Sequence, residues 1–348
     1  MRRAAPTLRD AHADRLRVFL ARLQIRLAYF LYFLVEYEQV EQTVAAALPV
    51  IRAACLAAEE GLALETVART RLRRGNYQAA KTAAQRSMAL AQQAGNDLQA
   101  TDALVLLARA AADEGDYDLA IRLHQQTVVF YRQLNYTVGT ARALTNLGNT
   151  HMLRGDYAAA QPLFATAHTM AQENKNRFLV IFTGTNLGLV LSEMGNDAAA
   201  AVYFHQNLVL ARELGEQRWF ALNLNYISLT ALHTNDLDGA QHYAQQALVV
   251  AHSIRCEPDV LSSITYLAHV WARRGSVQLA LRALLYVDQH PATLARDKHF
   301  NATLLATLRG ALGPENITAA AAWSKTKQLD DVVTWIDRGL LHTRTGLP

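Results

Sequence analysis

The sequence predicts an all-α solenoid built from consecutive helix hairpins, and three observations lead to this class. A short turn pattern recurs with a constant spacing of 40 residues between residues 74 and 277. Hydrophobic residues make up 51% of the chain and prolines number only seven, which suits well-buried helices. At 348 residues the chain exceeds the usual length of one compact core, so a repeat array explains its size.

Each copy of the recurring pattern predicts a turn between two helices. Its glycine, replaced once by Asn235, favours the left-handed conformation that ends a helix. The residue that follows is always Asn, Asp or Ser, which are good N-caps for the next helix. The copies are Arg74-Gly75-Asn76-Tyr77, Glu114-Gly115-Asp116-Tyr117, Arg154-Gly155-Asp156-Tyr157, Met194-Gly195-Asn196-Asp197, Asn235-Asp236-Leu237 and Arg274-Gly275-Ser276-Val277.

The positions around each turn repeat with the same period. A small residue stands four positions after each N-cap, where it lets two helices approach closely: Ala80, Ala120, Ala160, Ala200, Ala240 and Ala280. The preceding helix carries an apolar contact position at Leu107, Leu147, Leu187, Ile227 and Leu267. The second helix of each hairpin is expected to end near Gly95, Asn135, Lys175, Gly215 and Arg255.

These positions resemble the tetratricopeptide repeat, most closely at Asn146-Leu147-Gly148, His151, Gly155-Asp156-Tyr157, Ala160, Phe164 and Ala167. The usual repeat has about 34 residues. The longer repeat of this chain is similar to those of kinesin light chains and of sensor domains in bacterial STAND-type ATPases. The resemblance implies a right-handed α-α superhelix of about seven hairpins. The terminal proline of the motif is absent, and the consensus tyrosine is replaced at Ala111, His151, Leu191, Ala231 and Trp271.

The resemblance divides the chain into three parts. Residues 1–60 are expected to form a basic helical cap with an irregular first hairpin, and residues 61–290 to form six repeats. Residues 291–348 are expected to form a C-terminal helical cap, because His290-Pro291-Ala292-Thr293 and Gly313-Pro314 interrupt the register. A similar turn follows the last repeat in STAND regulators.

No catalytic or cofactor-binding motif is present in the sequence. The chain has no GxxxxGK[ST], HExxH, GxSxG or GxGxxG arrangement. Cys55 and Cys256 are far apart and form no metal-ligand spacing. We therefore expect a non-enzymatic protein without a cofactor or a metal.

Charge and hydropathy limit the partners and the location. The net charge is +4, but residues 1–30 alone carry seven arginines against two aspartates, so the repeat body is close to neutral. We expect no nucleic-acid binding by that body, whereas the basic arm either binds nucleic acid or an acidic partner, or forms a solvated helix face, which we favour. The apolar run 27–35 is too short to span a membrane. The polar start of the chain predicts no secretory signal and favours a cytoplasmic location. The resemblance to STAND regulators implies a bacterial source.

The resemblance also implies a binding surface, because the first helix of each tetratricopeptide repeat lines a concave groove. Asn146 and Asn186 occupy equivalent positions, and a primary amide can pair with both the N–H and the C=O of an extended peptide. The alternative is that they are ordinary polar residues facing water. The expected groove residues are Asp102, Arg109, Arg142, Asn146, Asn149, Phe182, Thr185, Asn186, Asn225, Tyr226, Thr265, Tyr266 and His269.

Three functions remain open from the sequence. The leading hypothesis is a scaffold that binds a protein or peptide partner in the groove. The second is a ligand-sensing domain of a STAND-type ATPase or transcription regulator, for which a small-molecule inducer is an alternative partner. The third is a peptide-pheromone receptor. The N-terminal helix could also fill the groove itself, since residues 27–35 are apolar.

Overall fold

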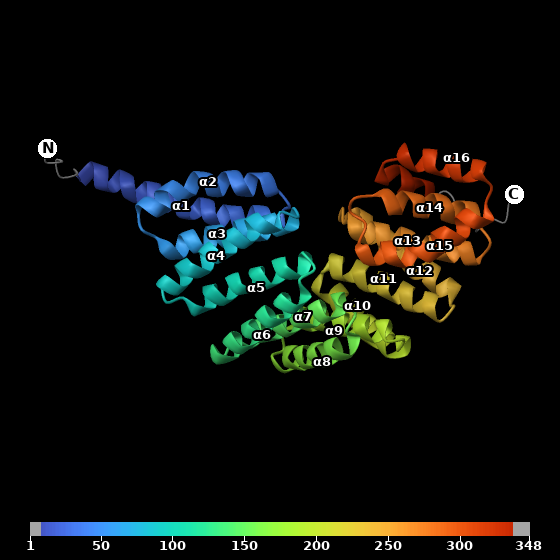
Figure 1. The fold of residues 1–348 in the computed structure, drawn as a ribbon, viewed down its shortest axis with the longest axis horizontal. Coiled ribbons are helices and arrows are strands. Elements are labelled where there is room, and N and C mark those ends of the chain that lie inside the picture. The colour runs from blue at the N-terminus through green and yellow to red at the C-terminus, as the bar shows by residue number, and fades with distance from the viewer. Residues whose placement is uncertain (1–7, 337–348) are drawn as a thin grey trace. The chain divides into compact units, whose positions relative to one another are not determined.

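The computed structural model describes residues 8–336, and the predicted all-α class is confirmed over this range. The chain divides into two compact units, Met1–Lys175 and Asn176–Pro348. In Figure 1 the helices of each unit follow one another in chain order, and each packs against its neighbours in sequence up to α15, whereas α16 packs against α14. None of the helices in the described range is long and apolar enough to cross a membrane.

The helices of the first unit begin 20 residues apart from the second helix onward. They are α1 (Leu8–Phe33), α2 (Tyr37–Ala53), α3 (Ala57–Arg73), α4 (Tyr77–Gln93), α5 (Asp97–Asp113), α6 (Tyr117–Gln133), α7 (Thr137–Leu153) and α8 (Tyr157–Glu173).

The second unit continues the same spacing and loses it near its end. Its helices are α9 (Arg177–Glu193), α10 (Asp197–Leu214), α11 (Gln217–His233), α12 (Leu237–Ser253), α13 (Glu257–Arg273), α14 (Val277–Gln289), α15 (Ala295–Ala311) and α16 (Pro314–Lys325), and residues 329–336 are helical again.

A residue with positive φ closes the helices at this spacing. All five predicted helix ends and all six predicted turns carry one, and the series extends back to Cys55 and Val35. After α7 the turn shows how the helix end is satisfied, because Gly155 N–H donates to Met152 O (2.9 Å) and Asp156 N–H donates to His151 O (2.8 Å). Asp156 Oδ1 then accepts from Ala159 N–H (3.2 Å) as the predicted N-cap. Ser276 occupies the equivalent position but makes no side-chain cap bond.

The core lies between odd-numbered and even-numbered helices. The six recurring alanines are all buried, as the close approach of paired helices requires. Odd-numbered helices also contact the next odd-numbered helix, from α1 to α7 in the first unit and from α9 to α15 in the second. We call these helices the odd layer. They correspond to the first helices of the predicted repeats, which carry the expected binding residues.

We expect Gly188→Ala to lower the free energy of unfolding by about 1–3 kcal/mol, because the cost of overpacking the core outweighs the better helix propensity of alanine. An added Cβ would lie 2.6 Å from Cε1 of the buried Phe204 ring on the paired helix α10. Denaturant unfolding followed by tryptophan fluorescence measures this, since Trp219, Trp271, Trp323 and Trp335 all belong to the second unit. Gly310→Ala is the control, because no atom lies within 4 Å of its added Cβ. Equal losses in both variants would contradict the packing argument.

Arg255→Gly is expected to raise the free energy of unfolding by about 1 kcal/mol, because a left-handed conformation strains residues other than glycine. Arg255 has a φ of 54° and an exposed side chain. The reciprocal variant Gly275→Arg should lose a similar amount at a φ of 84°, where the added Cβ meets no atom within 4 Å. The same fluorescence-detected titration measures both variants. A loss of stability in Arg255→Gly would show that the contacts of the arginine side chain contribute more stability than its strained backbone costs.

Candidate functional site

Three of the expected binding residues lie along one side of α7 in the first unit. Arg142 is exposed, and Asn146 and Asn149 are half-buried. Their spacing of four and three residues places them on one helix face. Within residues 8–336, no side-chain hydrogen bond or ion pair engages any of the three. Their donors and acceptors are therefore available to another molecule. We call them the α7 polar row.

The neighbouring helix α5 contributes charged side chains that are already partly paired. Arg109 is 45% exposed at its side chain, with Nε 3.7 Å from Asp113 Oδ2, a loose ion pair. Asp102 accepts a hydrogen bond from the hydroxyl of Tyr131. Burial of Asp113 raises the pKa of its carboxyl, although Arg109 and Arg73 oppose this. Of these groups, Arg109 is the most accessible cation.

A second charged pair extends this surface onto α3. Glu65 accepts from Arg69 Nη2 (2.6 Å) and Nε (3.1 Å), a bidentate contact on one carboxylate oxygen. Burial raises the pKa of the Glu65 carboxyl despite this partner. Because Glu65 and Arg69 neutralise each other, they shape the surface without adding net charge.

In the second unit, the accessible part of the odd layer is aromatic rather than charged. The edge of Trp219 on α11 contacts Phe182 and Phe178 on α9, with ring centroids 5.7 and 6.1 Å apart. Asn186 also lies on α9 and is half-buried, but its Nδ2 donates to Phe182 O (2.7 Å). The amide oxygen and the second N–H of Asn186 are left without a partner in the described range, so this residue still offers one acceptor and one donor.

Thr185 and Asn225, both expected in the groove, are instead buried within the scaffold. The Thr185 hydroxyl donates to Asn223 Oδ1 (3.1 Å) and accepts from Asn207 Nδ2 (3.1 Å). Asn225 is completely buried, where its Nδ2 donates to Asp259 O (2.9 Å) and its Oδ1 accepts from Ser263 (2.8 Å). Their polar groups join helices to each other and do not face a ligand.

Helix α15 covers the C-terminal part of the expected groove, which corrects the expectation for Tyr226, Tyr266 and His269. The guanidinium of Arg296 lies over the Tyr226 ring at 4.9 Å and donates to its hydroxyl (2.9 Å). Phe300 stacks on His269 with ring centroids 4.1 Å apart. Tyr226, Tyr266 and His269 are between 1% and 7% exposed.

Hydrogen bonds fix this cover. Asn301 Oδ1 lies 3.0 Å from His269 Nε2, and Asn301 Nδ2 donates to Thr265 Oγ1 (3.2 Å), so Thr265 too is engaged internally. Sequence reasoning treated residues 291–348 as a cap and missed Arg296, Phe300 and Asn301. The 40-residue period could have indicated this helix. A further repeat after α13 would begin its first helix at residue 297, and α15 begins only two residues earlier.

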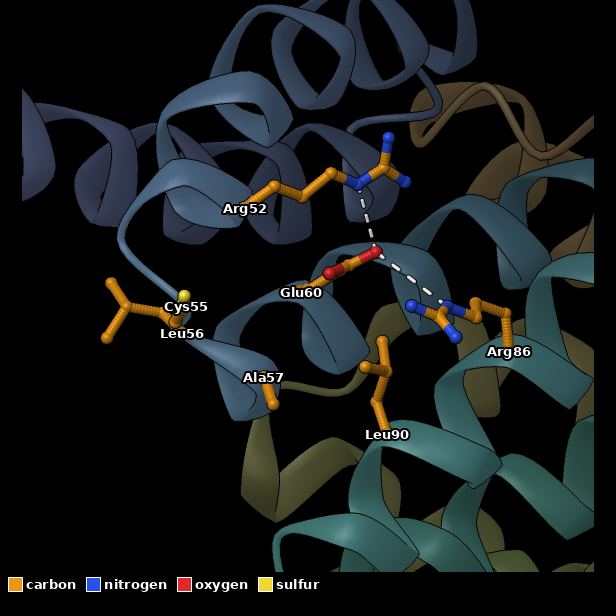
Figure 2. A pocket seen from close by; sticks show the side chains of 7 residues that line it. All are labelled: Arg52, Cys55, Leu56, Ala57, Glu60, Arg86 and Leu90. Carbon is orange, nitrogen blue, oxygen red and sulfur yellow. Dashed lines mark hydrogen bonds and ion pairs between the residues drawn. The ribbon is translucent and has the colours of Figure 1, made fainter.

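A hollow of about 410 Å³ lies at the turn between α2 and α3, beside α4. Figure 2 shows Arg52 and Arg86 directed at the carboxylate of Glu60, at 3.0 and 3.9 Å. The Glu60 carboxylate thus joins the side chains of α2 and α4. Because one carboxylate holds both arginines, we interpret this hollow as a structural ion-pair site with one excess positive charge. Nor do three His, Cys, Asp or Glu side chains gather as metal ligands would among the residues described.

Residues 99–173 and 139–206 match the family described as the tetratricopeptide repeat. No protein of curated function matches the chain in sequence. Among solved structures, the Rap conjugation gene regulator of plasmid pLS20 in complex with a Phr peptide is 13% identical, with 90% of this chain and 80% of that chain covered and a TM-score of 0.61.

Two further structures have the same fold. A Rap protein complexed with competence and sporulation factor is 13% identical, with 83% of this chain and 76% of that chain covered and a TM-score of 0.59. A STAND protein with a tetratricopeptide repeat sensor from Pyrococcus horikoshii is 13% identical, with a TM-score of 0.58. The match covers 82% of this chain and 41% of the STAND protein. The expected resemblance to such sensors is confirmed in the fold.

The buried His269 predicts a loss of stability in mild acid. Burial lowers the pKa of its imidazole from the usual 6.5 to about 4, although the bond to Asn301 opposes this. The unfolded chain therefore binds a proton between pH 6.5 and 4 that the folded chain excludes, and the free energy of unfolding falls through this window. His269→Gln should remove up to about 3 kcal/mol of that fall. Fluorescence-detected unfolding across this range measures it.

The control is His299→Gln, which replaces an exposed histidine on the same helix as Asn301. If the pH dependence of His269→Gln equals that of the wild-type chain, the buried imidazole does not titrate as expected.

Proposed function

We propose that this chain, which carries tetratricopeptide repeats over residues 99–206, is a non-catalytic scaffold that binds an extended peptide segment of a protein partner along its odd layer. The observation that carries the proposal is the α7 polar row, whose three side chains have no partner in the described structure. Unpaired amides on a half-buried face can pair with both the N–H and the C=O groups of a peptide backbone.

The geometry of the α7 polar row suits an extended peptide. From residue 142 to residue 149 a helix rises about 10 Å. An extended chain covers that distance in about three residues. The two amides can therefore pair with successive backbone groups of a peptide that runs along α7. Arg142 adds a charge-assisted bond to an acidic side chain or to the terminal carboxylate.

Solved structures of the same fold support a peptide as the ligand class. Two Rap proteins were solved with bound peptides, a Phr peptide in one and competence and sporulation factor in the other. In this chain, Arg109 on α5 offers a second cation, because its ion pair to Asp113 is loose enough to exchange for a ligand carboxylate. We therefore propose that the preferred peptide carries at least one acidic group.

In the second unit, Phe182, Trp219 and Asn186 form a separate part of the proposed surface. Partly exposed aromatic rings suit apolar side chains, since they give large contact area at a small entropic cost. We retain Phe182 and Asn186 as proposed binding residues. We exclude six other expected residues from the proposed site, because the chain itself buries them: Thr185, Asn225, Tyr226, Thr265, Tyr266 and His269.

A displayed library of random linear dodecapeptides tests the proposal. The wild-type chain should enrich acidic sequences. For the best synthetic peptide, Asn146→Ala with Asn149→Ala should weaken binding about 10- to 100-fold, the effect of losing hydrogen bonds worth about 1.5–3 kcal/mol. Isothermal titration calorimetry measures the Kd.

The matched control is Arg122→Ala with Gln126→Ala, which removes two exposed polar side chains from α6. Circular dichroism verifies that both double variants keep the wild-type helicity. An unchanged Kd in the α7 variant, or a library that yields no peptide binding to the wild-type chain, would remove peptide binding at this face.

A further inference from the structure

A continuous apolar stripe runs along the outward side of α1. It consists of Leu16, Leu20, Leu23, Leu27 and Phe30 on α1 and of Leu34 in the turn that follows, which we call the α1 stripe. Each side chain is between 49% and 69% exposed. The intervals alternate strictly between four and three residues, so the side chains form one narrow seam along the helix. Such spacing is the a/d pattern of a coiled coil.

The opposite side of α1 attaches the helix to its own unit. Ala21, Ile25 and Ala28 are buried in the core cluster that α1 shares with α2 and α3. Two of these three side chains are alanines, so most of the bulk of the apolar side chains lies on the face turned to solvent. Within residues 8–336, α1 does not occupy the expected binding groove, although its apolar run 27–35 had suggested that it could.

The exposed area is large enough for a stable interface. Phe19 and Phe33 flank the stripe and are 56% and 62% exposed. Eight half-exposed Leu and Phe side chains present on the order of 800 Å², since a fully buried aromatic ring covers about 150–250 Å². This is about the area that one partner contributes to a standard interface. It exceeds the largest patch of a typical monomer, about 300–600 Å².

The spacing of the stripe makes a second copy of the chain the best occupant. A seam of a/d residues is complementary to itself, so two copies related by a two-fold axis bury it completely.

The flanking charges select the orientation of the pair. In a parallel coiled coil, residues at g approach residues at e of the partner, which places Arg26 beside Leu31. In an antiparallel pair, g positions meet each other, and the two Arg26 guanidiniums would repel. Arg17 and Arg22 are held by Asp14 (3.1 Å) and Glu59 (2.7 Å) within one chain.

We propose that the chain forms a homodimer through α1, with the two α1 stripes paired in parallel as a short two-stranded coiled coil. The dimer is independent of the odd-layer binding surface, so either proposal can fail while the other stands.

Sedimentation equilibrium tests the dimer. The wild-type chain at micromolar concentration should have twice the monomer mass. Leu20→Glu with Leu27→Glu places carboxylates in the seam and should raise the dissociation constant about 100-fold or more. The matched control is Val202→Glu with Val209→Glu, which has the same spacing on two exposed valines of α10, 54% and 59% exposed, and should remain dimeric. Circular dichroism verifies that both variants fold.

A cysteine cross-link tests the parallel pairing without a destabilising charge. In a background with Cys55→Ser and Cys256→Ser, Leu23→Cys should oxidise to a covalent dimer, because a parallel seam places each Leu23 opposite its own copy. An antiparallel seam would instead cross-link a mixture of Leu23→Cys and Leu27→Cys chains, which would overturn the orientation.

A monomeric wild-type chain, or a dimer that survives both glutamates, would overturn the proposal. Binding to vesicles of phosphatidylglycerol and phosphatidylcholine tests the remaining alternative. A monomer that binds them through the same leucines would show that the stripe faces a membrane surface instead.

Discussion

The left-handed residue that closes a helix every 20 positions is the constraint on which the structure depends. It sets the helix length at 17 residues for most of the array and reverses the chain at a fixed place. Because two such steps make one repeat, residues 40 apart return to the same face of equivalent helices. Within each unit, the odd layer thus acquires rows of equivalent positions, such as Asp102 and Arg142 in the first unit. Chemistry can change along a row while the backbone stays the same.

Sequence reasoning identified most of this framework, because glycine and asparagine mark left-handed turns directly. It also anticipated the less obvious ends at Lys175 and Arg255, since the period required them. Val35 and Cys55 escaped because neither residue type favours positive φ, and the surrounding helices had to impose it. The N-cap at Ser276 was expected from residue type, yet its hydroxyl makes no cap bond. Residue preferences therefore locate turns more reliably than they locate individual hydrogen bonds.

The site was less predictable, because accessibility depends on partners that are distant in sequence. Arg142, Asn146 and Asn149 remain accessible on α7, as their spacing suggested. Tyr226, Tyr266 and His269 occupy equivalent faces, yet Arg296, Phe300 and Asn301 cover them from α15. Periodicity gives the face on which a side chain lies, but it does not reveal whether a later helix closes over that face. The His269–Asn301 contact joins residues 32 positions apart, a separation that differs from the 40-residue period.

The uniform spacing also affects how such a chain can change in evolution. An in-frame duplication of one hairpin inserts 40 residues between two left-handed turns and leaves every flanking helix in its original phase. Each new helix then meets the same kind of neighbour that its parent met, as the buried alanines of the six copies illustrate. A single-residue insertion inside a helix, by contrast, rotates all later side chains by about 100° relative to the core. Lineages carrying this architecture should therefore differ in length by whole hairpins, and their partner-binding rows should lengthen or shorten in the same steps.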